Sequence, residues 1–264
     1  MKRFLMCAPD FFEVRYAINP WMDGNLGMVD RTRARRQWQN LHRIVSGLAA
    51  VELVEQVAGL PDMVFTANAG LVHGKEAVVA SFLHAERQPE EQHFARFFAA
   101  RGYRLHPLKQ GTIFEGAGDA LFDARGRLWF GSGIRSDAHA REEVTAALNA
   151  DATGLELVDP RWYHLDTAFC PLPGDQAIAY KKAFSAKSAA SLDTAFGARI
   201  LWVTDADARD FACNAVSIGT NLIMHKASAE LKCALKRRGL EVIETDVSEF
   251  LKAGGACKCL TLEI

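Results

Sequence analysis

The strongest constraint on the fold is a repeat in the order of apolar segments. Five short runs of apolar and β-branched residues predict strands at 51–54, 103–105, 155–158, 199–203 and 240–243. Their starts are separated by 52, 52, 44 and 41 residues. A near-constant spacing of this size is typical of an architecture built from repeated units. We therefore expect one structural unit that is used about five times.

The segments that follow each of these runs also repeat. Two apolar runs flank a turn, which predicts a β-hairpin, and a segment with helical spacing comes next. The hairpins fall at 69–80, 120–131, 168–180 and 215–225, and the helices at 90–101, 137–149, 187–196 and 228–238. Each unit is thus predicted to consist of a strand, a hairpin and a helix.

The fifth hairpin is split between the two ends of the chain. Residues 258–264 supply one of its strands and residues 2–8 the other. Pairing of the two ends would close the units into a ring and remove exposed sheet edges. We expect a single α/β domain over residues 1–264, with a looser α/β stack of the same units as the alternative.

The composition excludes several classes of function. Lys and Arg number 31 against 32 Asp and Glu, so the chain lacks the basic surface of a nucleic-acid-binding protein. Four arginines at 31, 33, 35 and 36 predict a solvated helix face. No apolar run reaches the length of a membrane span, and the N-terminal apolar stretch is too short for a signal peptide. We expect a cytoplasmic protein with no membrane partner.

The six cysteines do not form a disulfide framework of the kind found in small secreted proteins. The sequence contains no CxxC and no HExxH motif, so a bound metal is not expected. Cys257 and Cys259 are separated by a single residue. A reactive thiol is the remaining chemical use for one of these cysteines.

Polar residues gather at the same place in every unit, immediately before the hairpin. These polar segments are 61–68, 114–119, 163–167, 213–214 and 254–262. Equivalent positions converge if the units surround an axis. One pocket would then collect a thiol, an imidazole and three carboxylates, from Cys259, His164, Asp62, Glu115 and Asp166.

This set of side chains predicts a reaction on a cationic substrate. A thiolate is a strong nucleophile, and an imidazole can take its proton or serve as a general acid. Three carboxylates in an apolar cavity are costly unless a cation neutralises them. No lysine or arginine recurs with them, so the substrate is expected to supply the cation. A guanidinium suits this role because its donors form a planar fork.

The motifs resemble those of the guanidino-group-modifying enzymes, which include arginine deiminases, dimethylarginine dimethylaminohydrolases, arginine dihydrolases and amidinotransferases. The resemblance covers essentially the whole chain and implies the pentein fold, a pseudo-fivefold α/β propeller. Its markers are Pro61-Asp62, Phe65-Thr66-Ala67-Asn68, Phe114-Glu115-Gly116-Ala117-Gly118-Asp119, His164-Leu165-Asp166, and Gly254-Gly255 before Cys259-Leu260-Thr261-Leu262.

The resemblance also implies catalytic roles. Cys259 is the expected nucleophile and His164 the acid–base. Glu115 is the third expected catalytic residue. It also anchors the guanidinium, together with Asp62 and Asp166. Attack on the guanidinium carbon would give an amidino-thioether that water then hydrolyses. A thiol and carboxylates suffice for these steps, so the resemblance implies no metal and no organic cofactor.

Further positions narrow the choice of substrate. Arg135 and Arg87 are the candidates for binding the substrate carboxylate. Dimethylarginine hydrolases usually have a lysine where Asp166 stands and an acidic residue where Asn68 stands, so the resemblance favours unmethylated arginine and the arginine dihydrolases. The chain length is typical of the dimethylarginine group, which is the first alternative.

Four other questions remain open from the sequence. An amidinotransferase would pass the amidino group to an amine, and a ribosome-binding factor shares the fold without catalysis. The product could be ornithine or citrulline, and the protein could form a homo-oligomer.

Overall fold

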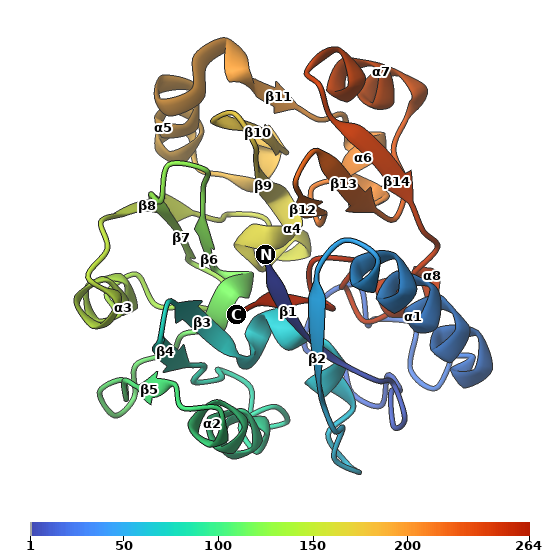
Figure 1. Ribbon diagram of the computed structural model, residues 1–264, viewed down its shortest axis with the longest axis vertical. Coiled ribbons are helices and arrows are strands. Elements are labelled where there is room, and N and C mark those ends of the chain that lie inside the picture. The colour runs from blue at the N-terminus through green and yellow to red at the C-terminus, as the bar shows by residue number, and fades with distance from the viewer. Residues whose placement is uncertain (1) are drawn as a thin grey trace.

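All five predicted hairpins form in the computed structural model, which describes residues 2–264. Each hairpin gains a third strand, and the resulting sheets surround a common centre (Figure 1). In order around the ring, the sheets are β15 (Leu262–Glu263), β1 (Arg3–Cys7) and β2 (Ala50–Val54); β3 (Gly70–His73), β4 (Glu76–Val79) and β5 (Arg104–Leu105); β6 (Ala120–Phe122), β7 (Leu128–Ser132) and β8 (Ala152–Glu156); β9 (Phe169–Leu172), β10 (Gln176–Ala179) and β11 (Ile200–Trp202); β12 (Val216–Ile218), β13 (Asn221–Met224) and β14 (Glu241–Glu244). The prediction of a pseudo-fivefold α/β propeller is confirmed.

The third strand of each sheet pairs with a different hairpin from the one that the sequence predicted. The strand that was expected to open each unit pairs with the hairpin of the preceding unit, as β5 does with β4 and β8 with β7. These pairs are parallel. Parallel neighbours cannot be joined by a tight turn and need a crossover, which here is a helix. The structural unit is therefore a hairpin, a helix and a strand, which shifts the predicted unit by one element.

The split hairpin closes the ring. Strand β1 pairs antiparallel with β15, where Phe4 lies opposite Glu263 and Leu5 opposite Leu262. It also pairs in parallel with β2. Both chain ends therefore lie near the centre of the ring (Figure 1).

The longer helices lie on the outside of the ring (Figure 1). They are α1 (Arg31–Ser46), α2 (Glu90–Ala100), α3 (Ala140–Leu148), α5 (Ala186–Phe196) and α7 (Ala229–Arg237). Each buries one apolar stripe, as α2 does with the predicted spacing of Phe94, Phe97 and Phe98. Apolar side chains between helices and sheets form the core. None of the helices in residues 2–264 is both long and apolar enough to cross a membrane.

Helix α1 begins at the arginine-rich segment. The side chain of Asp30 caps it by accepting a hydrogen bond from the backbone N–H of Arg33. Arg31, Arg33 and Arg35 are exposed and form ion pairs with carboxylates of other segments. The predicted solvated helix face is confirmed.

Short helical turns complete the structure. Several stand directly before the first strand of a hairpin, where the sequence places its polar segments. The short turns are η1 (Pro61–Val64), η2 (Thr66–Ala69), η3 (Gly116–Gly118), η4 (Pro160–Trp162), α4 (Leu165–Ala168), η5 (Lys181–Ala183), η6 (Gly197–Arg199), α6 (Asp205–Arg209) and α8 (Ser248–Leu251).

Candidate active site

Hydrogen bonds join the polar segment of every unit to that of the next unit. Each of these bonds involves at least one backbone group, so it fixes the position of the chain, and three of them also fix a side chain. Around the ring they run from Asn68 Nδ2 to Glu115 O (2.8 Å), from Leu165 N to Asp119 Oδ1 (3.0 Å), from Asn214 Nδ2 to Asp166 O (3.0 Å), from Lys258 N to Asn214 O (3.2 Å) and from Ala67 N to Cys259 O (3.1 Å). The predicted convergence of the polar segments on one axis is therefore present.

Cys259 lies in the turn before β15 and is 3% exposed. Its Sγ atom is 3.1 Å from Nδ2 of Asn214 and 3.5 Å from Oδ2 of Asp166. Oδ1 of Asn214 also accepts a hydrogen bond from the backbone N–H of Cys259 (3.1 Å). One amide side chain thus positions both the backbone and the thiol.

The electrostatic surroundings keep the Cys259 thiol protonated. Burial raises the pKa of the thiol well above its ordinary value, and the negative charge of Asp166 raises it further. A cation placed beside the sulfur would act in the opposite direction and favour the thiolate. The arrangement therefore suits a nucleophile that ionises when a cationic ligand is bound.

Cys257 has a different environment from Cys259. It is fully buried in the apolar core, and burial alone raises the pKa of its thiol. It does not line the cavity beside Cys259.

Asp166 is buried next to the thiol. Burial raises the pKa of its carboxyl group to about 6, although the charge of Lys258 and hydrogen bonds from Cys259 and Asn214 oppose the rise. The group lies in the first turn of α4, directly after His164 and Leu165.

Glu115 connects the predicted acid–base to a predicted substrate-binding arginine. Its Oε2 atom accepts a hydrogen bond from Nη1 of Arg135 (2.9 Å) and lies 2.7 Å from Nε2 of His164. Burial acts to raise the pKa of Glu115, but the charge of Arg135 and the His164 hydrogen bond outweigh it and lower the pKa below its ordinary value. Glu115 is held as a carboxylate.

This ion pair corrects one expectation from the sequence. We expected the substrate to supply the cation that neutralises the carboxylates, yet Arg135 already does so for Glu115. Arg135 is only 5% exposed and lies over the ring of Tyr163, at 4.6 Å from the ring centre. It reaches the site from the loop after β7, which carries none of the polar segments.

Arg87 reaches the site from the loop after β4. Its guanidinium makes two hydrogen bonds to the carboxylate of the buried Glu90, at 3.0 and 2.9 Å. It also donates to Oδ1 of Asn68 (3.0 Å) and to the carbonyl oxygen of Asp62 (3.2 Å). Burial raises the pKa of Glu90 to about 7, against the lowering effect of Arg87.

Asp62 offers an unused acceptor to the site. Its Oδ2 accepts a hydrogen bond from the hydroxyl of Tyr16 (2.9 Å). Its Oδ1 is buried and has no hydrogen-bond partner within residues 2–264. Burial raises the pKa of this carboxyl group, while Arg87 and Tyr16 oppose the rise. A buried carboxylate oxygen without a partner is costly, so a ligand that donates a hydrogen bond would stabilise it.

These side chains enclose a small cavity of about 10 Å³, which has room for about one water molecule. Ile18, Asn19 and Met22, from the segment between β1 and α1, close one side of it. A larger ligand therefore requires these side chains to move. The predicted site residues that line the cavity are Asp62, Asn68, Arg87, Arg135 and Cys259.

The other three predicted residues lie directly behind this lining. Glu115 contacts Arg135, His164 contacts Glu115, and Asp166 contacts Cys259. All eight predicted residues thus belong to one cluster. No group of His, Cys, Asp and Glu side chains suited to a metal ion occurs within the described residues 2–264.

Gly118 makes this close arrangement possible. A Cβ atom at this position would collide with Nδ2 of Asn68 and lie 3.3 Å from the ring of His164. Gly118 therefore allows the second unit to pack against both side chains.

Sequence reasoning did not assign a role to three residues of the cluster. Asn214 stands in the polar segment of the fourth unit, and that shared position was the available signal. Tyr16 and Glu90 lie outside every polar segment. Glu90 begins a helix, where an acidic residue is common for reasons of the helix dipole, so nothing in the sequence distinguished it.

Comparisons with known proteins agree with the fold and with the predicted family. A family model described as "N,N dimethylarginine dimethylhydrolase, eukaryotic" matches residues 28–264. The bifunctional arginine dihydrolase/ornithine cyclodeaminase AgrE of Nostoc sp. is 47% identical over 264 residues, which is 99% of this chain but 38% of that protein. The dimethylarginine dimethylaminohydrolase of Mycobacterium tuberculosis is 42% identical over 264 residues, covering 100% of this chain and 86% of that protein.

A solved structure gives the same result for the fold. The crystal structure of the N-terminal domain of ArgZ, an arginine dihydrolase from cyanobacteria, superimposes with a TM-score of 0.99 at 46% identity. The match covers 100% of this chain and 98% of that one, a cysteine-to-serine mutant bound to its substrate.

The fold and these relatives place the chain in the pentein-fold superfamily of guanidino-group-modifying enzymes, as the motifs predicted. Within this class, the chain belongs to the dimethylarginine dimethylaminohydrolase family of hydrolases.

Proposed function

We propose that the chain is an arginine dihydrolase, which converts arginine and two water molecules into ornithine, two ammonia molecules and carbon dioxide. The AgrE relative and the ArgZ domain, both named as arginine dihydrolases, support this substrate. AgrE is much longer than this chain, so only its dihydrolase activity is carried over to the proposal.

The main support for the proposal is the environment of the Asn68 side chain. Its side chain lines the cavity beside Cys259 and is fixed by Arg87 on one side and by the carbonyl of Glu115 on the other. One N–H and one lone pair of the amide remain for a ligand. A neutral amide can hold both a guanidinium and the neutral ureido group that the first hydrolysis produces.

In the proposed mechanism, the substrate guanidinium enters between the carboxylates of Asp62 and Asp166. Its positive charge lowers the pKa of the Cys259 thiol, His164 takes the thiol proton, and the sulfur attacks the guanidinium carbon. His164, held by Glu115, gives a proton to the departing nitrogen, which leaves as ammonia.

The resulting amidino-thioether is hydrolysed by water that His164 deprotonates. This step forms a carbon–oxygen bond, breaks the carbon–sulfur bond and returns the thiol. A second cycle on the bound ureido group releases the second ammonia, and the carbamate that remains breaks down to carbon dioxide and ornithine. We propose Arg135 as the residue that reads the substrate carboxylate, and Arg87 as the second candidate.

A dimethylarginine hydrolase is the second candidate function. The family model and the M. tuberculosis relative, most of whose length is covered, favour it. This reaction would give citrulline and dimethylamine from dimethylarginine. The carboxylate at Asp166 argues against it because a dimethylated nitrogen has no hydrogen to donate there.

The test is an incubation of the purified protein with arginine, dimethylarginine or agmatine, followed by identification of the products by mass. Ornithine from arginine supports the dihydrolase, and turnover of dimethylarginine alone supports the second candidate. An arm with added glycine detects amidino transfer. No turnover of any substrate would favour a non-catalytic binding factor.

Two further properties belong to the proposal. We propose the cytoplasm as its compartment because all six cysteines are free thiols, as suits a reducing environment. We also propose a homo-oligomer, which light scattering on the purified protein would test.

A further inference from the structure

A second cavity, of about 730 Å³, lies at the centre of the ring. Its lining includes the hairpin turns at Gly74, Gly126 and Gly219, which follow the first strands β3, β6 and β12. The polar segments of the Cys259 site precede these same strands. The strands therefore separate the two cavities, which share no lining residue.

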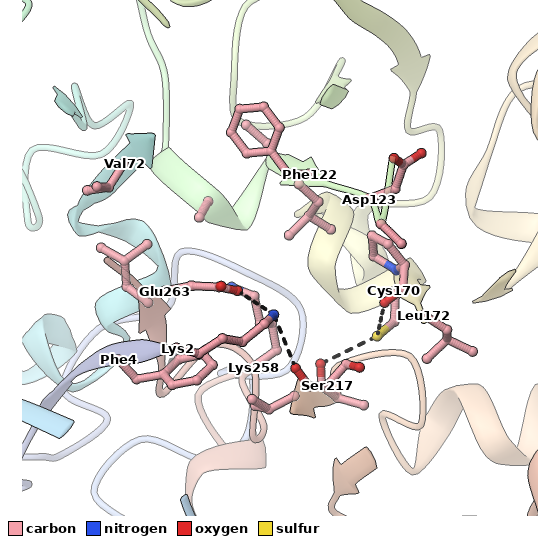
Figure 2. Close-up of a pocket in the computed structure, with 18 of the residues that line it drawn as sticks. Lys2, Phe4, Val72, Phe122, Asp123, Cys170, Leu172, Ser217, Lys258 and Glu263 are labelled. Atoms are coloured by element: carbon pink, nitrogen blue, oxygen red, sulfur yellow. Dashed lines mark hydrogen bonds and ion pairs between the residues drawn. The ribbon is translucent and has the colours of Figure 1, made fainter. Parts of the chain in front are cut away.

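The walls of this second cavity are mostly apolar. Side chains from different sheets face the same space, among them Val72, Phe122 and Leu172 (Figure 2). A concave apolar site of several hundred Å³ with a few polar groups is typical of small-molecule binding. A ligand with an apolar body would remove this surface from water, which is favourable.

Polar groups gather on one side of the cavity. Lys2 donates a hydrogen bond to Glu263 (2.8 Å) and lies 3.4 Å from the carbonyl oxygen of Ser217 (Figure 2). These two side chains neutralise each other. Asp123 also lines the cavity, but its Oδ2 atom accepts hydrogen bonds from Arg127 and Trp129 (2.7 and 2.9 Å).

Of the two lysines that line the cavity, Lys258 is the one with no carboxylate in direct contact, although its charge also acts on the buried Asp166. It forms no ion pair with any residue of 2–264, and its ammonium group has only the carbonyl oxygen of Thr261 as an acceptor, at 3.4 Å. The side chain is partly buried and lines the cavity. A cation with no carboxylate in direct contact, beside an apolar wall, favours a ligand that brings a single negative charge.

We propose that this cavity binds an amphipathic monoanion, with a carboxylate on Lys258 and an apolar body against Phe122 and Leu172. Charge and shape together select this class. A neutral apolar molecule would leave the ammonium group unpaired, and an organic cation would be repelled by it. No residue that lines the Cys259 cavity takes part, but the charge of Lys258 also acts on Asp166, so the proposal is tested by direct binding and not by turnover of arginine.

The probe for the test is decanoate, titrated into the folded protein by isothermal titration calorimetry below its micelle concentration. We expect saturable binding at one site, with decanol binding more weakly and decylamine more weakly still. A saturating concentration of arginine should leave the affinity for decanoate unchanged.

Two variants locate the binding site. Lys258→Gln removes the charge and should weaken decanoate binding about tenfold or more, the usual cost of losing a charge-assisted hydrogen bond. Ser217→Trp fills the cavity from β12 and should weaken decanoate and decanol alike. Lys187→Gln, at an exposed lysine outside the cavity, is the matched control and should bind like the wild type. Circular dichroism confirms that each variant is folded before it is titrated.

The proposal is overturned if wild-type protein shows no saturable binding of decanoate. It is also overturned if decanol binds as tightly as decanoate, because Lys258 would then recognise nothing. Binding that persists unchanged in both cavity variants, or that arginine displaces, would place decanoate elsewhere. These outcomes leave the proposed dihydrolase activity untouched, and a chain that fails to hydrolyse arginine can still bind decanoate.

Discussion

The carboxylate of Asp166 lies 3.5 Å from the sulfur of Cys259, and its charge adds to the effect of burial in raising the pKa of the thiol. Two groups that are costly to ionise are thus buried side by side. A bound guanidinium would stabilise both anions at once. The pair therefore links recognition of the substrate cation to activation of the nucleophile.

The same pair predicts a measurable effect on stability. Folding raises the pKa of Asp166 from 3.8 to about 6. The protonated form therefore favours the folded state below pH 4, and this contribution is lost as the pH rises through 6. The loss is about 3 kcal/mol for a shift of about two pKa units. Relative to wild type, Asp166→Asn should be more stable at pH 8 than at pH 4 by about this amount, measured by urea denaturation at both pH values. A difference that does not change with pH would contradict the assignment.

The two neighbouring cysteines predict different results for the same substitution. Cys259→Ser should abolish turnover of arginine and leave the fold intact, because the proposed nucleophile is lost. Cys257→Ser should retain activity, because its thiol lies in the core and away from the cavity. Steady-state assays of both variants decide the matter. Equal loss in both variants, or an active Cys259→Ser protein, would contradict the choice of Cys259.

Asn214 should act by positioning Cys259. Asn214→Ala removes the hydrogen bonds to the sulfur and to the backbone N–H of Cys259, so we expect kcat to fall about tenfold to a hundredfold with little change in KM. Asn221→Ala, at a hairpin residue outside the site, is the control and should behave as wild type. A change confined to KM would show that Asn214 binds the substrate instead.

Arg135 should distinguish arginine from agmatine, which has no carboxylate. In Arg135→Ala, both substrates lose rate because Glu115 loses the charge that lowers its pKa. KM for arginine should rise about tenfold to a hundredfold more than KM for agmatine, the usual effect of losing one charge-assisted hydrogen bond. Equal changes for the two substrates would mean that Arg135 only supports Glu115, and Arg87 would then be the candidate.

Much of the fold could be predicted from the sequence because each unit carries its own local signals. Alternating apolar runs around glycine-containing turns specify hairpins, and the spacing of Phe94, Phe97 and Phe98 specifies one face of a helix. The pairing of β5 with β4 could not be predicted from such local patterns. Which hairpin a strand joins depends on the crossover of the intervening helix, a long-range property.

The candidate site was predictable where its residues recur at equivalent positions before a hairpin. Cys259, His164, Glu115 and Asp166 share that position, and the ring brings them together. The internal ion pairs were not predictable, because Arg135 and Arg87 come from loops after the hairpins. Glu90, which holds Arg87, lies in a helix whose sequence is ordinary.

The products formed from arginine by the wild type and by Asn68→Asp test the central claim most directly. An aspartate at 68 would still accept a hydrogen bond from Arg87 but could not donate one to a ureido group or to the carbonyl of Glu115. The neutral intermediate should therefore leave before a second attack by Cys259. We predict ornithine and ammonia from the wild type, and accumulation of citrulline from Asn68→Asp, identified by mass. Wild-type protein that stops at citrulline after prolonged incubation would contradict the dihydrolase and leave a single hydrolysis as the reaction.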